Sequence, residues 1–280
     1  MIRDGQTNFV FIADTLPTKY PEFAKEFVSK LEQAKIPFGI LPNTKDVWAV
    51  DYMPIQVSVN KFIRFTYKPD YLITTKKMSR TISDVDSICH AIGIPTIKSD
   101  IILDGGNLSR WNNKVLMTTK VFTENKSIPE LDLIDQLKNL LEVNELFFVP
   151  VEKDDWLGHI DGMARFIAND TVLINDFNKE KQNDYIDFLG ALHNSGLKWK
   201  TFPFNPYDNE DFDDAAGLYL NYLELENHLV LPIFGKETDK EAIEKSKRIF
   251  PNKQLIPLMS SEPAKHTGII NCLTWNIKRG

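Results

Sequence analysis

The sequence predicts an α/β protein, and three observations support this. Five segments space their apolar residues as helices do, nine short β-rich runs lie among them, and each helical segment is followed within a few residues by a run with strand character. The helical segments begin at intervals of roughly 45 to 60 residues, which indicates repeated copies of one αβ unit. Such a repeat favours a closed, propeller-like arrangement, although an open doubly wound sheet shows the same alternation.

The helical segments are supported by apolar stripes and by residues typical of helix ends. In the first segment, Phe23, Phe27 and Leu31 lie on one stripe. Ser83 is the expected N-cap of the second segment, and Gly93 is its stop signal. The predicted helices are residues 20–35, 82–92, 129–143, 183–194 and 239–250.

The expected strands are short runs rich in β-branched, aromatic and other apolar residues. They are residues 9–13, 38–41, 61–67, 115–119, 146–151, 171–174, 199–204, 229–233 and 254–258, and the strand expected after the second helical segment is residues 94–97. No low-complexity linker or clear change of composition marks a boundary between these elements. Residues 1–280 are therefore predicted to form a single domain.

The bulk composition limits the possible partners. The net charge of −6 and the pI near 5.5 argue against a nucleic-acid surface, and an acidic protein is better suited to attract a small cation. No segment has the ~20 consecutive apolar residues of a membrane span, and residues 1–8 lack the apolar run of a secretory signal. With only Cys89 and Cys272, no disulfide framework is implied. We therefore expect a cytoplasmic protein that binds neither membrane nor nucleic acid.

Residues 205–214 form an acidic, turn-rich stretch. Aspartate-rich loops can bind calcium, but this one lacks the EF-hand order of ligands with a central glycine and a closing glutamate. A solvated loop is the favoured interpretation. Residues 208–214 could then act as a lid that contributes carboxylates to a cationic substrate.

A thiol, an imidazole and several carboxylates lie beside short apolar runs: Cys272, His159, Asp161, Asp51 and Asp104. Two carboxylates can hold a guanidinium ion through charge-assisted, bidentate hydrogen bonds. The central guanidinium carbon is a poor electrophile, so the nucleophile must be strong, as a thiolate is. An imidazole can protonate the departing ammonia and then activate water. The set fits removal of an amino group from a guanidinium ion.

Each candidate also has a simpler interpretation. Cys272 lies between apolar residues, where cysteine is often only a small buried side chain. His159 and Asp161 are two residues apart and would share one face of a strand, but this spacing is common by chance. Asp51 could end a turn, and Asp104 could belong to a hairpin turn. Cys89, in the middle of a predicted helix, is assigned to the core.

Signatures of other chemistries are missing from the sequence. There is no Cys-x-x-Cys or His-Glu-x-x-His metal motif, no Gly-x-Gly-x-x-Gly or Walker loop, and no Gly-x-Ser-x-Gly nucleophile motif. We expect no metal and no cofactor.

Together, the motifs resemble the agmatine deiminase and bacterial peptidylarginine deiminase-like family of guanidino-modifying enzymes. The similarity runs from about residue 48 to residue 278. The motifs that carry it occur in the family's order: Trp48-Ala-Val-Asp-Tyr-Met-Pro-Ile55, Asp104-Gly-Gly-Asn107, Gly158-His-Ile-Asp161, Asn227-His-Leu-Val-Leu-Pro232 with Asp239 beyond, and Gly268-Ile-Ile-Asn-Cys-Leu-Thr274.

The resemblance implies a fold, a site and a reaction. The fold would be a five-bladed αβ propeller, the pentein fold, with the site at its axis. Cys272 would be the nucleophile and His159 the general acid and base, while Asp161 and Asp51 would hold the guanidinium. Within the same motifs, the remaining substrate-binding residues would be Asp104, Trp48 and Asn107.

Some positions depart from the family pattern. Asp104 stands where the family usually has glutamate before Gly-Gly, which withdraws the carboxylate by about one methylene. Val50 replaces an arginine, and Asn271 replaces the histidine that usually precedes the cysteine. The catalytic residues are retained, whereas the contacts to the substrate tail are altered. Agmatine, free arginine and peptidyl arginine therefore all stay open as substrates.

Three hypotheses follow for this single catalytic domain. The first is a hydrolase that converts a guanidino substrate to a ureido product and ammonia through a covalent thiouronium on Cys272. The second is an amidinotransferase, which would pass the same covalent group to an amine. The third is a non-catalytic guanidinium-binding protein, which the presence of Cys272 and His159 disfavours. The expected partner is a small cationic guanidino compound, and a homodimer is possible.

Overall fold

The computed structural model describes residues 1–75, 79–152, 155–177, 185–207, 209–211 and 213–280. Its contacts divide the chain into two compact units. The first unit holds Met1–Arg3, Asp51–Ile82 and Gly93–Thr201, and the second holds Asp4–Val50, Ser83–Ile92 and Phe202–Gly280. Each unit is described by itself.

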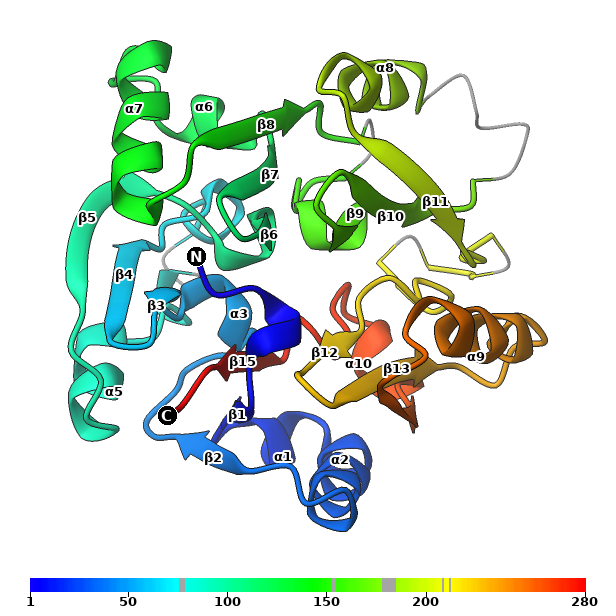
Figure 1. The fold of residues 1–280 in the computed structure, drawn as a ribbon. Coiled ribbons are helices and arrows are strands. Elements are labelled where there is room, and N and C mark those ends of the chain that lie inside the picture. Colours follow the sequence, from blue (N-terminus) through cyan, green and yellow to red (C-terminus); the bar gives the residue numbers. More distant parts are fainter. Residues whose placement is uncertain (76–78, 153–154, 178–184, 208, 212) are drawn as a thin grey trace. The chain divides into compact units, whose positions relative to one another are not determined.

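The described residues form five three-stranded sheets (Figure 1). The first unit contains the sheets β3-β4-β5, β6-β7-β8 and β9-β10-β11, and the second contains β15-β1-β2 and β12-β13-β14. The strands are β1 (Phe9–Ala13), β2 (Phe38–Leu41), β3 (Ile55–Ser58), β4 (Lys61–Thr66), β5 (Ile97–Ile102), β6 (Ser109–Trp111), β7 (Lys114–Thr118), β8 (Glu145–Val149), β9 (Ala164–Ala168), β10 (Thr171–Asn175), β11 (Lys198–Phe202), β12 (Leu223–Glu224), β13 (His228–Ile233), β14 (Gln254–Met259) and β15 (Thr274–Ile277).

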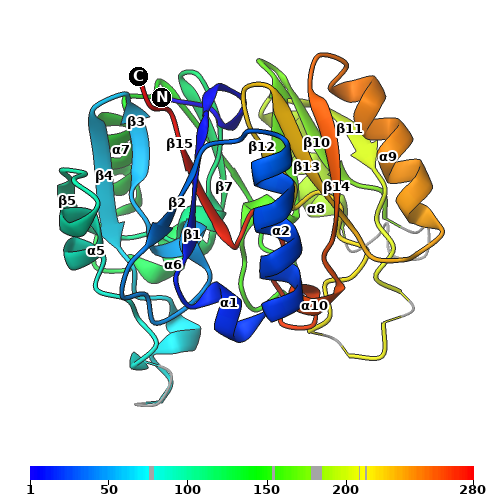
Figure 2. The same cartoon turned by 90° about the horizontal axis from the view of Figure 1, so that it is seen from below.

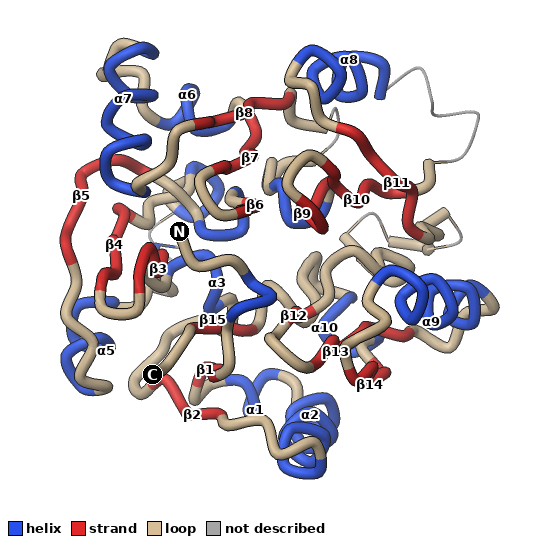
Figure 3. The backbone as a smooth tube through the Cα atoms, in the orientation of Figure 1, coloured by secondary structure: helices blue, strands red, loops and turns tan. Residues whose placement is uncertain are grey.

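In each sheet, helices connect the central strand to the next strand along the chain (Figure 3). They are α1 (Leu16–Lys19), α2 (Pro21–Gln33), α5 (Val85–Ala91), α6 (Lys120–Glu124), α7 (Glu130–Leu141), α8 (Ile186–Asn194) and α9 (Thr238–Ile249), with the short α3 (Ala49–Tyr52) and α10 (Ser261–Ala264) elsewhere. Each of the five predicted helical segments therefore contains a helix. The start of the fourth, residues 183 and 184, lies outside the described residues.

All five sheets repeat one arrangement of strands. The central strand pairs antiparallel with a short strand on one side, as in β3–β4, and in four sheets it pairs parallel with the strand that follows the helix, as in β4–β5. The parallel pairs need the helical crossover, because strands running the same way cannot be joined by a tight turn. The repeat is thus ββαβ, with one strand more than the predicted αβ unit.

The sheet β15-β1-β2 pairs strands from the first and the last segments of the second unit. Its short antiparallel strand, β15, comes from the end of the chain, and Phe9 of β1 pairs with Ile277 of β15. In the other four sheets the short strand directly precedes the central one. The repeat is therefore permuted, with one copy assembled from the first and last strands.

Local chemistry explains where the helices begin and end. Pro21 occupies the first turn of α2, where a missing N–H removes no hydrogen bond. The predicted N-cap of α5 was wrong: Asp84, not Ser83, caps the helix by accepting a hydrogen bond from the Ser87 N–H. Gly93 and Gly196 adopt positive φ angles just beyond α5 and α8, as helix-ending glycines do.

The first unit has two apolar cores. Leu133, Leu137 and Leu141 on one face of α7 are buried together with Val115 and Met117 of β7. The other face of that sheet contributes Leu116 to a second cluster around Phe188 and Leu192 of α8. Alternate residues of β7 thus fill both cores, as the two-residue period of a strand requires.

The second unit is built on β1 and α2. Phe23, Phe27 and Leu31 form the buried stripe of α2, as predicted, and the helix lies against β14 (Figure 2). Val10 and Ile12 of β1 are fully buried. Cys89 is buried in α5, which agrees with its assignment to the core. None of the helices in the described ranges is both long and apolar enough to span a bilayer.

Candidate active site

In four of the five repeats, predicted site residues lie just before the short antiparallel strand. Asp51 in α3 precedes β3, and Asn107, the last residue of the 3-10 helix η3 (Gly105–Asn107), precedes β6. Asp161, in the 3-10 helix η4 (Ile160–Gly162), precedes β9, and Cys272 precedes β15. In these four copies, the sheet that follows each functional residue fixes its backbone.

The structure corrects the predicted setting of His159 and Asp161. They do not lie on one face of a strand: His159 is the N-cap residue of η4 and Asp161 is inside this single turn. Both side chains are buried. Gly158 precedes them with a φ of 66°, a conformation that costs a residue with a Cβ atom. A turn, rather than a strand, therefore aims the imidazole.

His159 lies between two carboxylates of the first unit. Its Nε2 is 3.0 Å from Asp104 Oδ2, and its Nδ1 is 3.5 Å from Asp51 Oδ1. Burial alone would lower the pKa of His159, but the two carboxylates outweigh it and raise the pKa to about 9. The raised pKa favours the imidazolium at neutral pH, with Nε2 hydrogen-bonded to Asp104 and Nδ1 facing Asp51.

Asp51 is held from a third direction by the backbone. Its Oδ1 accepts a hydrogen bond of 3.1 Å from the Gly106 N–H. A Cβ atom on Gly106 would lie 2.6 Å from this oxygen and 2.8 Å from His159 Nδ1, so only glycine allows the approach. Burial, followed by the nearby charges of Asp104 and Asp161, raises the pKa of Asp51 to about 7, against the opposing effect of His159. The carboxylate thus lacks full compensation, which suits a site for an incoming cation.

Asp104 is completely enclosed and is not part of a hairpin turn. Its Oδ2 contacts both His159 Nε2 and Lys120 Nζ, the latter at 3.2 Å. Burial would raise the pKa of Asp104, but His159 and Lys120 together lower it below its usual value. Although the side chain is one methylene shorter than glutamate, it still reaches the imidazole.

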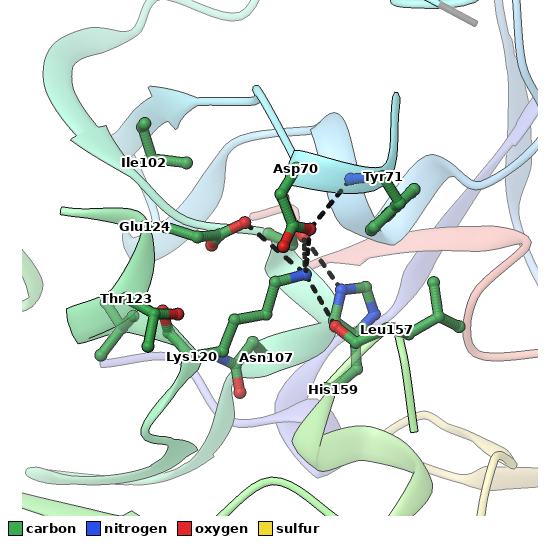
Figure 4. Close-up of polar contacts among 12 residues, drawn as sticks. Asp70, Tyr71, Ile102, Asn107, Lys120, Thr123, Glu124, Leu157 and His159 are labelled. Carbon is green, nitrogen blue, oxygen red and sulfur yellow. Dashed lines mark hydrogen bonds and ion pairs between the residues drawn. The ribbon is translucent and has the colours of Figure 1, made fainter. Parts of the chain in front are cut away.

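Lys120 is an unexpected member of this cluster (Figure 4). Its ammonium lies 2.7 Å from the Leu157 carbonyl oxygen, 3.6 Å from Glu124 Oε1 and 3.8 Å from Asp70 Oδ1. The lysine itself is 5% exposed. Burial would lower its pKa, but the surrounding carboxylates raise it, so the side chain stays an ammonium.

Asn107 connects η3 to the end of β7. Its Oδ1 accepts from the Thr118 N–H at 2.8 Å, and the Thr118 hydroxyl donates to the Gly158 carbonyl at 2.6 Å. Asn107 Nδ2 is buried without a hydrogen-bond partner among the described residues. Asn107 therefore positions the His159 turn with one end of its amide and leaves a donor at the other.

The second unit presents the thiol. Cys272 is half-buried, whereas Ile270 and Leu273 beside it are fully buried. Asn221 Nδ2 donates to Cys272 Sγ at 3.2 Å. Asn221 Oδ1 accepts from the backbone N–H groups of Asn271 and Cys272, which fixes the orientation of the amide so that its NH₂ faces the sulfur. An N–H donor aimed at sulfur favours the thiolate over the thiol.

Trp48 also belongs to the second unit and packs against the loop that leads to Cys272. A Cβ atom on Gly268 would overlap the Trp48 ring, so glycine is required there. The Lys19 ammonium lies 4.9 Å from the ring centroid of Trp48. The indole thereby supports the cysteine loop.

Two of the predicted residues, Asp51 and Asp104, thus each contact a third, His159, within the first unit. Asp161 is buried close enough for its charge to affect Asp51. Lys120 and Asn221 were missed. Their only sequence signals were a lysine directly after a predicted strand and an asparagine inside the apolar run 218–223. Within the described ranges, no three His, Cys, Asp or Glu side chains are grouped so that they could hold a metal ion.

The raised pKa of His159 predicts how stability depends on pH. A histidine with a raised folded-state pKa contributes its full stabilisation below its unfolded value of about 6.5, and this contribution is lost as the pH rises through about 9. The difference in unfolding free energy between the protein and His159→Gln should therefore fall by on the order of 3 kcal/mol across this window. Denaturant unfolding at both ends measures it, with the exposed His193→Gln as control. A difference in unfolding free energy that does not change with pH would contradict the stabilisation of the His159 imidazolium by Asp51 and Asp104.

The sequence of this chain matches a known protein family. The family model of the Porphyromonas-type peptidyl-arginine deiminases matches residues 17–277. The chain belongs to this family. The match includes every predicted site residue, from Trp48 to Cys272.

Relatives of this deiminase family are distant in sequence. A Vibrio parahaemolyticus protein named "Putative agmatine deiminase" is 22% identical over 223 residues, which is 68% of this chain and 62% of the relative. A Mycoplasma mycoides protein of the same name is 23% identical over 67% of this chain and 60% of its own length. The chain thus spans about three fifths of the length of these curated relatives.

Solved structures show the shared fold. The agmatine deiminase of C. jejuni has a TM-score of 0.78 at 20% identity, with 100% of this chain and 96% of that chain covered. The protein therefore has a mixed α/β fold of the pentein kind.

Proposed function

We propose that the protein is a guanidine deiminase that hydrolyses a guanidino substrate to a ureido product and ammonia. The observation that carries the proposal is the buried imidazolium of His159 between Asp51 and Asp104 in a chain of this deiminase family. A guanidinium is a planar cation with paired N–H donors, which a buried carboxylate binds with charge-assisted hydrogen bonds. Asp51 and Asp161 are the proposed ligands of that cation.

The contact between Asp51 and His159 gives a binding step. We propose that the substrate guanidinium takes the place of the imidazolium at Asp51. His159 would then keep its hydrogen bond to Asp104 through Nε2, while its Nδ1–H turns to the amino group that leaves. One carboxylate thereby serves the histidine cation before binding and the substrate cation after it.

The proposed reaction has two halves. The Cys272 thiolate forms a bond to the central guanidinium carbon, the bond from that carbon to one nitrogen breaks, and His159 supplies the proton with which ammonia leaves. Water then attacks the thiouronium carbon and gives a proton to His159. The carbon–sulfur bond breaks and the remaining hydroxyl proton passes to the solvent, where ammonia takes it up, which releases the ureido product and restores the thiolate.

Other residues have supporting roles in this proposal. Asp104 would hold the imidazole in place rather than contact the substrate, since its Oδ2 already contacts His159 and Lys120. The amide donor of Asn107, which has no hydrogen-bond partner in the described part of the chain, is a proposed ligand of the substrate. Trp48 is a second proposed ligand, through the face of its ring.

We also propose that the five sheets close into one five-bladed propeller and that residues 1–280 act as one catalytic domain. The shared strand order of the sheets and the pairing of β15 with β1 support this closure. The acidic lid is still a prediction, with Asp208 and Phe212 outside the described residues. A homodimer and a cytoplasmic location also stay predictions.

Product analysis tests the proposed function. The protein is incubated separately with agmatine, free arginine, a peptidyl arginine and methylated arginines, and ammonia and ureido product are measured. We expect equal amounts of both from at least one compound. Transfer of the amidino group to an added amine without ammonia would instead identify an amidinotransferase, and binding without any product a guanidinium-binding protein.

Substitution of the proposed guanidinium ligands should weaken transition-state binding. Asp51→Asn and Asp161→Asn each remove one charge-assisted contact, so kcat/KM should fall by an amount equivalent to roughly 2–5 kcal/mol. The affinity of these variants for a neutral ureido analogue should fall much less. Asp170→Asn, at a surface ion pair with Lys198, is the control. Equal losses for the charged and neutral ligands would show that Asp51 and Asp161 act only on the structure.

A further inference from the structure

Lys120 is a buried cation to which the proposed reaction assigns no step. It is the first residue of α6, just beyond β7, and its ammonium contacts with described residues lie within the first unit. A buried ammonium is retained only where carboxylates or carbonyl oxygens compensate for its lost hydration. The arrangement of those partners indicates what the lysine does.

The ammonium is connected to His159 by two routes. Through Asp104, one carboxylate oxygen is shared between Lys120 Nζ at 3.2 Å and His159 Nε2 at 3.0 Å. Through the backbone, Lys120 Nζ donates to the carbonyl of Leu157, two residues before the histidine. Lys120 thus contacts both the partner of the imidazole and the segment that carries it (Figure 4).

The stem of Lys120 supports the same turn. A Cβ atom on Gly158 would lie 3.2 Å from Lys120 Cδ, so the glycine packs directly on the lysine side chain. The Gly158 carbonyl accepts from the Thr118 hydroxyl, two residues before Lys120. The end of β7 and the start of α6 therefore form one wall against which the His159 turn is fixed.

We propose that Lys120 is a positioning residue that keeps Asp104 as a carboxylate and holds it, with the His159 turn, in the geometry needed for catalysis. The proposal rests on the proposed deiminase function. Lys120 acts through Asp104 and touches no reacting atom.

Every charged group that faces Lys120 takes part in this balance. Asp104 approaches from the residue before η3, Glu124 from the next turn of α6, and Asp70 from the 3-10 helix η2 (Asp70–Leu72), while the Tyr71 ring centroid is 4.8 Å away. Burial, followed by the charge of Asp104, raises the pKa of Glu124 to about 7. Above that pH, Lys120 and His159 face several carboxylates. Loss of the Lys120 cation should therefore raise the pKa of His159, and loss of a neighbouring carboxylate should lower it.

The test compares opposite charge changes around Lys120. Lys120→Met removes the cation with little change of shape, and Glu124→Gln removes a neighbouring anion. The midpoint of the His159 titration, followed by NMR of ¹⁵N-labelled imidazoles, should rise by roughly one pH unit in Lys120→Met. In Glu124→Gln it should fall. Lys61→Met, which breaks the surface ion pair with Glu142 in the same unit, should leave it unchanged.

Kinetics separate positioning from a general structural role. With the substrate found in the product screen, Lys120→Met should lower kcat roughly tenfold to a hundredfold, as loss of a group that orients a catalytic residue does. KM should stay nearly constant, because Lys120 does not bind the substrate. Equal losses in kcat and in 1/KM would overturn the positioning role.

The titration does not depend on turnover, so the two proposals can fail separately. If the wild-type protein has no deiminase activity, but the His159 midpoint rises in Lys120→Met and falls in Glu124→Gln, only the proposed function is refuted. An unchanged His159 midpoint in both folded variants would refute the role of Lys120. If Lys120→Met does not fold, the downward shift in Glu124→Gln decides, and its absence overturns the proposal.

Discussion

Replacement of Cys272 by serine should abolish turnover of the guanidino substrate and leave the fold intact. An alcohol at this position is a far weaker nucleophile than a thiolate, and the guanidinium carbon is a poor electrophile, so kcat should fall by roughly 10⁴-fold or more. The serine hydroxyl keeps a hydrogen-bond partner in Asn221, and the site is half-buried, so the unfolding free energy should change by only about 1 kcal/mol. Steady-state kinetics and denaturant unfolding measure the two quantities.

The second cysteine supplies the matched control. Cys89 is buried in α5 as part of the core, so Cys89→Ser should cost stability but keep most of the activity. If Cys272→Ser keeps its activity and Cys89→Ser loses it, the covalent mechanism through Cys272 is excluded.

Replacement of His159 by alanine should lower turnover by about 10²–10⁴-fold. The imidazole is the proposed proton donor to ammonia and the acceptor from water, and both half-reactions slow without it. Its removal also leaves the buried Asp51 and Asp104 without a shared cation. The loss should therefore appear in kcat for every substrate that is accepted.

Alkylation of Cys272 shows whether His159 acts on the substrate or on the thiol. If the histidine serves as acid and base, a small alkylating agent should still react with Cys272 in His159→Ala at neutral pH. If it mainly activates the thiol, alkylation should recover only near the unperturbed thiol pKa of ~8.5. Cys89→Ser in the background restricts the readout to one thiol. Unchanged turnover and unchanged alkylation would place His159 outside the site.

Sequence patterns predicted the long elements of the fold well, and physical reasons explain the exceptions. Helices α2 and α7 have an apolar stripe over 13 and 12 residues, enough for the 3.6-residue period to be clear. The antiparallel strands β3, β6, β9, β12 and β15 were all missed. They are only two to five residues long, and all four residues of β15 are buried, so no alternation is visible.

These missed strands explain why the site was only partly predictable. Each one fixes the backbone just after a functional residue, so the motifs mark the start of a repeat rather than a strand of their own. This is why His159 and Asp161 were wrongly placed on a strand. A two-residue spacing alone cannot distinguish a strand from a single 3-10 turn.

The residues that support the candidate site were harder to predict than those expected to react. Cys272, His159, Asp51 and Asp161 are chemically distinctive and lie in ordered motifs. Lys120 is a residue type that is almost never fully buried without partners, and those partners, Asp104 and Leu157, are 16 and 37 residues away. Asn221 is 51 residues from Cys272. Only the folded chain brings such pairs together.

Isotope labelling of the product tests the central claim most directly. The substrate identified in the screen is turned over in H₂¹⁸O by the wild-type protein and by Cys272→Ser, and the ureido product and ammonia are quantified by mass spectrometry and assay. The proposed mechanism predicts one ¹⁸O atom in each ureido product, one ammonia per product, and neither above background in the variant. Ureido product formed by Cys272→Ser at the wild-type rate, or no ammonia from any guanidino compound with the wild type, would contradict it.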